Sequence, residues 1–206
     1  MHTLHCTSAC REHKDSVARQ SLIIFALSLA LLAGDAFAEV SESLSYTDYR
    51  VEANGRQSLS KLLANSSPIR HKGKTFHAYT TWRISWQYRW DKDTDGACRI
   101  ARVSTTLDTT IQLPRLDNAS ARQQEQFQRY LVALRQHELG HHHYGRQAAQ
   151  EVDRQLQAMP AMPDCTRLIA AANRLAHHIV ERYKDEERTY DLVTVHGRTQ
   201  GARLDY

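Results

Sequence analysis

The segment from Phe76 to Trp90 alternates between apolar and polar side chains over its whole length. All three Trp residues of the chain occupy one parity, and Arg, Ser and Gln side chains occupy the other. A period of two over this length is typical of a half-buried strand in an antiparallel sheet, with the Trp rings in the core. Asp91 to Gly96 forms a turn, and Ala97 to Leu113 alternates again. The sequence therefore predicts a long β-hairpin, with a bulge near residue 100 where the parity slips.

The remaining periodic segments predict one further strand and three helices. Their expected bounds are a strand at 43–51, a short helix at 55–64, a long helix capped by Asp117 or Asn118 and running to about Ala158, and a second helix at 166–187 followed by a tail. Pro114 is expected to end the sheet. We therefore expect an α+β fold, in which a small antiparallel sheet packs with a long helix and a second C-terminal helix.

Residues 1–38 have the pattern of an export signal. Basic residues precede an apolar run at 22–33, which ends in the small-x-small sequence Ala36-Phe37-Ala38. The run is shorter than the roughly 20 residues that span a bilayer. We predict cleavage after Ala38, no stable membrane insertion afterwards, and a periplasmic or secreted mature chain of one domain at 39–206. A retained membrane anchor is the alternative.

Cys98 and Cys165 are the two cysteines that remain in the mature chain. In an exported protein such a pair most simply forms one disulfide, and two buried free thiols are the alternative. The formal net charge of +4 is mild, and no basic run interleaves with aromatic residues. Nucleic acid is therefore not an expected partner.

His137-Glu138-Leu139-Gly140-His141 matches the HExxH pattern of zinc hydrolases. Residues four apart share a helix face, so His137 and His141 can bind one metal ion. On a helical wheel Glu138 and His141 fall within the apolar stripe of the long helix, and His137 lies on its flank. Buried polar groups without partners cost several kcal/mol each, and a divalent cation would compensate for this cost. We expect Zn²⁺ bound by His137 and His141, with Glu138 as the base that activates a water.

A catalytic zinc site of this kind needs a third protein ligand. Gln147 stands where one class of zinc proteases has a third His. Glu151 lies about 15 Å along the helix from the motif, which is too far to share its metal. The tail after the second helix offers His196 and Asp191. We favour His196 as the third metal ligand and keep Asp191 as the alternative, beside a tail that has no role at the site.

Further landmarks accompany the motif along the chain. They are Thr81-Trp82, Cys98, Leu113-Pro114, Cys165, Tyr190-Asp191, Thr194, His196-Gly197 and Gln200-Gly201-Ala202. With HELGH, they resemble a bacterial family of exported zinc-dependent proteases, known mainly as a domain of unknown function, over most of residues 44–204. The resemblance implies a zincin-like fold, metal ligation by His137 and His141, a catalytic Glu138, and His196 as a candidate ligand.

Two functions of different classes follow from these observations. The first is an exported zinc metallopeptidase that hydrolyses peptide bonds in a peptide or protein substrate. The alternative is a non-catalytic, zinc-stabilised binding module of the cell envelope. A calcium loop at Asp91–Gly96 is disfavoured because Arg102 stands where the bidentate Glu would be, so we expect a tight turn there.

Overall fold

The computed structural model describes residues 40–53, 57–71 and 73–204, so the predicted export signal lies outside the described residues. Its main sheet has three strands in the order β1 (Ser41–Glu52), β5 (Cys98–Asp117) and β4 (Tyr79–Lys92). Two short strands, β2 (Arg70–His71) and β3 (Lys74–Thr75), form a separate small sheet. The helices are α1 (Leu59–Ser66), α2 (Ala121–Gln157), α3 (Cys165–Thr194) and the 3-10 turn η1 (Arg198–Gln200).

Strands β4 and β5 form the predicted antiparallel hairpin. The register shifts after Arg89, which pairs with Arg102, because the next residue Trp90 pairs with Ile100. Ala101 is therefore the extra residue of a bulge, as the slip in parity predicted. Trp82 and Trp86 are buried on the inward face. Asp93 Oδ1 accepts hydrogen bonds from the backbone at 95 and 97, which confirms a tight turn at the hairpin tip.

The sheet is mixed, and the expectation of a wholly antiparallel sheet is wrong. Strand β1 runs parallel to β5, from Ser41 opposite Thr106 to Glu52 opposite Asp117. The connection that contains α1 leads into β4 at the end of the sheet where β1 finishes, and β4 carries the chain back to the other end. Strand β5 therefore runs in the same direction as β1. Pro114 does not end the sheet either. Strand β4 pairs with β5 only as far as Gln112, so Pro114 lies where β5 lacks its β4 neighbour, and an edge tolerates Pro.

Side-chain caps set the starts of the helices at positions that differ from the predicted ones. Ser58 caps α1, which begins four residues later than expected. Ser120 caps α2 through a reciprocal capping box with Gln123. The predicted residues do not cap α2, because Asp117 ends β5 and Asn118 has a left-handed φ of 56°.

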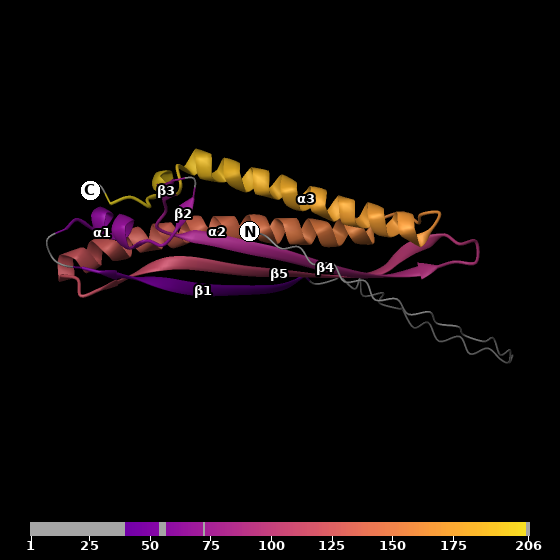
Figure 1. The fold of residues 1–206 in the computed structure, drawn as a ribbon, viewed down its shortest axis with the longest axis horizontal. Helices are drawn as coiled ribbons and strands as arrows, with labels where there is room; N and C mark the ends of the chain where they lie inside the picture. Colours follow the sequence, from indigo (N-terminus) through magenta and orange to yellow (C-terminus); the bar gives the residue numbers. More distant parts are fainter. Residues whose placement is uncertain (1–39, 54–56, 72, 205–206) are drawn as a thin grey trace, which may run out of the picture.

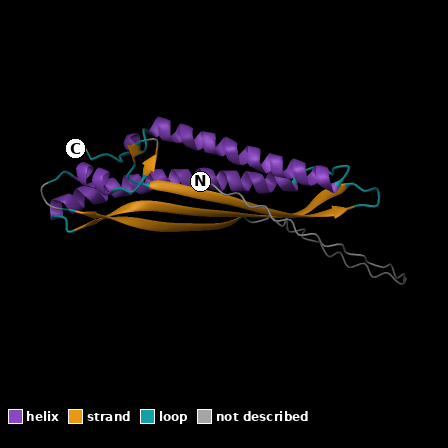
Figure 2. Cartoon of the chain, in the orientation of Figure 1, coloured by secondary structure: helices purple, strands orange, loops and turns teal. Residues whose placement is uncertain are grey.

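Helix α2 packs along the inward face of the sheet, and α3 packs antiparallel against α2 (Figures 1 and 2). The apolar stripe of α2 is buried at Phe127, Leu134, Val152 and Leu156, and Leu131 is partly buried. His137, Glu138 and His141 are also buried, at 3%, 4% and 7% exposure. The apolar face of α2 is therefore interrupted by ionisable groups in mid-helix, as the helical wheel predicted.

Helix α3 continues through Thr194, so most of the predicted tail is helical and its expected end at Glu187 is wrong. Val195, His196 and Gly197 then adopt left-handed φ values of 50°, 50° and 82°. Left-handed backbone is uncommon for non-Gly residues and is an outlier for a β-branched one such as Val195. This turn reverses the chain and leads through η1 back toward α2.

Cys98 and Cys165 form the predicted disulfide. It joins the first residue of β5 to the first residue of α3, and Cys98 also exchanges two backbone hydrogen bonds with Met162. The bond therefore fixes the start of α3 to the hairpin. Among the described residues, no helix combines the length and the apolar character that a membrane span requires.

Replacing both cysteines by Ser should lower the free energy of unfolding by about 4 kcal/mol, because the bond closes a loop of 67 residues in the unfolded chain. Urea unfolding of the wild type and of the Cys98→Ser/Cys165→Ser variant measures the difference. A loss below about 1 kcal/mol would show that the disulfide contributes little to stability.

Candidate metal centre

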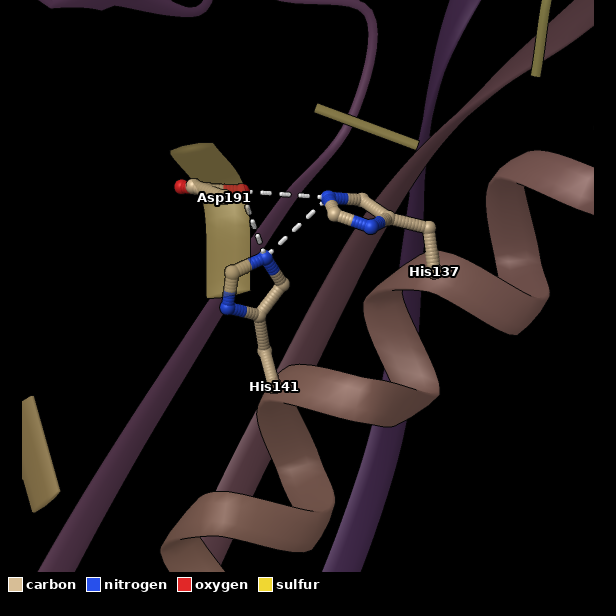
Figure 3. Close-up of side chains that lie close together, drawn as sticks. All are labelled: His137, His141 and Asp191. Carbon is tan, nitrogen blue, oxygen red and sulfur yellow. Dashed lines mark hydrogen bonds and ion pairs between the residues drawn. The ribbon is translucent and has the colours of Figure 1, made fainter. Parts of the chain in front are cut away.

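His137 and His141 of α2 face Asp191 of α3 across the interface between the two helices (Figure 3). The Asp191 Oδ1 atom lies 3.1 Å from His137 Nε2 and 3.1 Å from His141 Nε2. The two Nε2 atoms are 3.2 Å apart. Two nitrogen atoms and one oxygen atom therefore form a nearly equilateral triangle.

The size of this triangle fits a small divalent cation. Zinc binds imidazole nitrogen and carboxylate oxygen at about 2.0 to 2.2 Å in tetrahedral geometry. Ligand atoms at those distances are roughly 3.3 Å from one another. The observed separations of 3.1 to 3.2 Å match this value closely. All three residues of the triangle also line the cleft described below.

A carboxylate fixes the orientation of the His141 ring. Nδ1 of His141 lies 3.0 Å from Glu187 Oε1, and a carboxylate can only accept, so Nδ1 donates. The indole Nε1 of Trp82 donates to the same oxygen over 3.1 Å and so holds Glu187 in place. In the neutral ring of His141, Nε2 is then the unprotonated atom, as metal ligation requires.

Gln200 and Tyr190 support His137 in a similar way. Nδ1 of His137 lies 2.9 Å from Gln200 Oε1, and the Tyr190 ring stacks on the imidazole at 5.0 Å. The Tyr190 hydroxyl also donates to the carbonyl oxygen of His137 over 3.2 Å. Tyr190 fits there because residue 140 is Gly: a Cβ atom on Gly140 would lie 2.2 Å from the Tyr190 hydroxyl oxygen.

These outer hydrogen bonds determine what the inner atoms can do. When both rings are neutral and each Nδ1 donates outward, the two Nε2 atoms and Asp191 Oδ1 are all acceptors. Three acceptors in mutual contact repel one another unless a cation or extra protons lie between them. The donor set is therefore built for a positive charge at its centre.

Without a metal ion, a proton on His141 supplies the positive charge. Burial alone would lower the pKa of His141, but its hydrogen bonds to Asp191 and Glu187 outweigh burial and raise the pKa to about 10. Burial would raise the pKa of Asp191, but its contacts with the His137 and His141 imidazoles hold this pKa well below its usual range. A metal ion that binds must therefore displace a proton from His141.

Glu138 lies beside the triangle, buried at 4% exposure. The Thr80 hydroxyl donates to its Oε2 over 2.7 Å and to its backbone carbonyl over 3.2 Å. Burial raises the pKa of Glu138, although the charge of His141 and the hydrogen bond from Thr80 oppose this. A carboxylate with a raised pKa is a better proton acceptor than an exposed one.

A cleft of about 740 Å³ opens onto these groups. Its floor is the face of α2 that carries Tyr130, His137, Glu138 and His141, together with Asp191. One lip is the segment 74–78 that leads from β3 into β4, and the other is the segment 195–204. A substrate in this cleft would therefore contact Glu138 and the metal ligands together.

Asp191, the predicted alternative ligand, belongs to the triangle, and His196, the favoured one, lies next to it. His196 Nδ1 is 3.3 Å from Asp191 Oδ1, and its side chain is 44% exposed. Its ring meets Phe76 edge-on at 5.0 Å. Ligation by His196 stays a prediction. Glu151 pairs with Arg182 and Tyr183 away from the triangle, in agreement with its exclusion.

The sequence analysis missed the supporting residues Glu187, Tyr190 and Thr80. Glu187 and Asp191 are four residues apart on α3, so they share a face as His137 and His141 do. That spacing would have revealed the pair if the helix had been predicted to continue past residue 187. Thr80 lies on the inward face of β4. A hydroxyl group among the apolar residues of that face was the signal that could have identified it as a supporting residue.

Gly140→Ala should displace the Tyr190 ring and lower zinc affinity about 10- to 100-fold, as loss of an outer support typically does. Zinc titration against a competing chelator measures the effect. Gln136→Ala, at an exposed position of α2, is the control and should bind zinc like the wild type. Equal affinity for Gly140→Ala and the control would mean that Tyr190 does not support His137.

The chain matches a family described as "Bacterial protein of unknown function (DUF922)" over residues 46–197. This span contains the hairpin, α2, α3 and every residue of the triangle. Comparisons with curated proteins and with solved structures gave no match. The zincin-like fold and the protease activity expected from the sequence thus stay predictions. Because the match covers most of the chain, the protein belongs to this bacterial family.

Proposed function

We propose that the protein is an exported, zinc-dependent hydrolase of peptide bonds. The observation that carries the proposal is the position of a buried carboxylate, Glu138, beside three converging ligand atoms at the floor of a cleft. The disulfide between Cys98 and Cys165 supports export, because such bonds persist in oxidising compartments. The substrate class is a peptide or protein.

The donor set supports zinc as the metal. Two imidazoles and one carboxylate, with an open position for water, are a known ligand set of catalytic zinc. The same set binds iron(II) in some oxygenases. Glu138 favours zinc, because a buried carboxylate next to the open position serves the proton transfers of hydrolysis.

When bound, zinc would supply a Lewis acid that polarises a carbonyl group and lowers the pKa of a water. The Thr80 hydroxyl occupies Oε2 of Glu138 and leaves Oε1 to accept a proton from the attacking water. As the water oxygen bonds to the carbonyl carbon, Glu138 holds this proton. It then delivers the proton to the amine nitrogen as the C–N bond breaks.

Glu138→Gln should lower the rate of peptide hydrolysis by about 100- to 10,000-fold, because the amide cannot accept the proton. The variant should still bind one zinc per chain, since Glu138 is not among the three ligands. Digestion of a peptide library, with and without a chelator, measures hydrolysis, and elemental analysis measures zinc.

Glu125→Gln, an exposed change on the same helix, is the matched control and should retain full activity. Hydrolysis that persists in Glu138→Gln would remove Glu138 from the mechanism. A wild type that binds zinc and cleaves nothing would favour the zinc-stabilised binding module. Iron in place of zinc would contradict the proposed metal.

Asp191→Ala should lower zinc affinity more than His196→Ala does, because Asp191 contacts both imidazoles and His196 contacts only Asp191 within the group. Competitive zinc titration of the two variants tests the order. A larger loss in His196→Ala would instead make His196 the third ligand, as the sequence analysis favoured.

A further inference from the structure

The lips of the cleft carry positively charged side chains. Lys74 lies on the lip formed by residues 74–78, and Arg198 and Arg203 lie on the lip formed by residues 195–204. All three side chains are exposed. In Figure 1, β3 and the C-terminal segment lie close together at the same end of the molecule. The entrance to the cleft is therefore flanked by cations from both sides.

The acidic groups of the cleft all lie at its floor. Of the described residues that line it, the acidic ones are Glu138 and Asp191. A divalent ion in the triangle would balance the charge of these two carboxylates. Among the residues that line the cleft, Lys74, Arg198 and Arg203 then contribute the remaining net charge, which is positive.

The backbone holds the C-terminal lip against the metal centre. A Cβ atom on Gly197 would lie 3.0 Å from the Cβ and Cγ atoms of His137, so this turn packs directly on a ligand. Ala202 N donates to Gly197 O over 3.0 Å, and Arg203 N donates to Gly201 O over 2.8 Å. The ring contact between Phe76 and His196 links this lip to the other one. The backbone that carries Arg198 and Arg203 is therefore held beside the site.

We propose that the cleft selects peptides that carry a carboxylate near the bond to be cleaved, and that Lys74, Arg198 and Arg203 bind this carboxylate. The inference rests on the proposed function and names the substrate class of the same site. Arginine matches a carboxylate through two parallel hydrogen bonds, and lysine adds a point charge. The carboxylate comes from an acidic side chain or from the C-terminus of a peptide.

Binding to the full-length Glu138→Gln protein, loaded with zinc, tests the inference without relying on turnover. Fluorescence anisotropy would compare labelled peptides that differ only in Glu or Gln at one position, and in a free or amidated C-terminus. We expect the carboxylate-bearing peptide to bind at least tenfold more tightly at low salt, with a smaller preference at high salt. An effect of Glu against Gln would identify an acidic side chain as the source of the carboxylate, and an effect of amidation would identify the peptide C-terminus.

Variants then test which residues produce the preference for the carboxylate-bearing peptide. Arg198→Gln and Arg203→Gln should each reduce it several-fold, and Arg198→Glu should shift it toward a peptide that carries Lys. Arg99→Gln, an exposed change near the distant tip of the hairpin, is the matched control and should leave it unchanged. Circular dichroism confirms that each variant is folded.

The outcomes separate this inference from the proposed function. Equal binding of all peptides, or a preference that survives in both Arg198→Gln and Arg203→Gln, would overturn the inference. A carboxylate preference in binding, with no cleavage of any peptide by the wild type, would uphold the inference and overturn the hydrolase. Cleavage by the wild type without any carboxylate preference would overturn the inference and uphold the hydrolase.

Discussion

The contact between α2 and α3 brings together three acceptor atoms that would repel one another without a positive charge between them. Neighbouring groups hold the residue that carries each atom in place. Glu187 and Trp82 hold His141, Gln200 and Tyr190 hold His137, and α3 itself carries Asp191. These supports come from β4, α3 and the C-terminal turn, so most of the fold contributes to one small triangle. These contacts therefore position the three atoms around a point where a positive charge, from a proton or a metal ion, is favourable.

Periodicity predicted the parts of the fold in which one face of an element is apolar. The hairpin, its bulge and the long helix follow from such faces, and so do the motif residues His137, Glu138 and His141. The parallel pairing of β1 with β5 depends on the path of the intervening chain, which no local pattern encodes. Pro114 was misread because a strand edge is a property of the assembled sheet and not of the residue.

The end of α3 was missed for a physical reason that also bears on the choice between Asp191 and His196 as the third ligand. Its last turns direct Glu187, Tyr190 and Asp191 toward α2, while Leu192 and Val193 are 74% and 67% exposed. A helix end whose inward side chains are polar has no apolar stripe by which periodicity could detect it. Asp191 therefore looked like one member of an irregular tail, and His196 was favoured over it.

The two ends of α3 are fastened by different chemistry. Its first residue is bonded covalently to the hairpin through Cys98, and its last turns meet α2 at the triangle and at the supports around it. A metal ion there would act as a second cross-link, reversible where the disulfide is durable. The lip at 195–204 continues directly from this end of α3, and its turn contains two non-Gly residues with left-handed backbone. An ion bound there would therefore hold the same end of α3 from which this lip continues, so that metal binding and the shape of the cleft would be coupled.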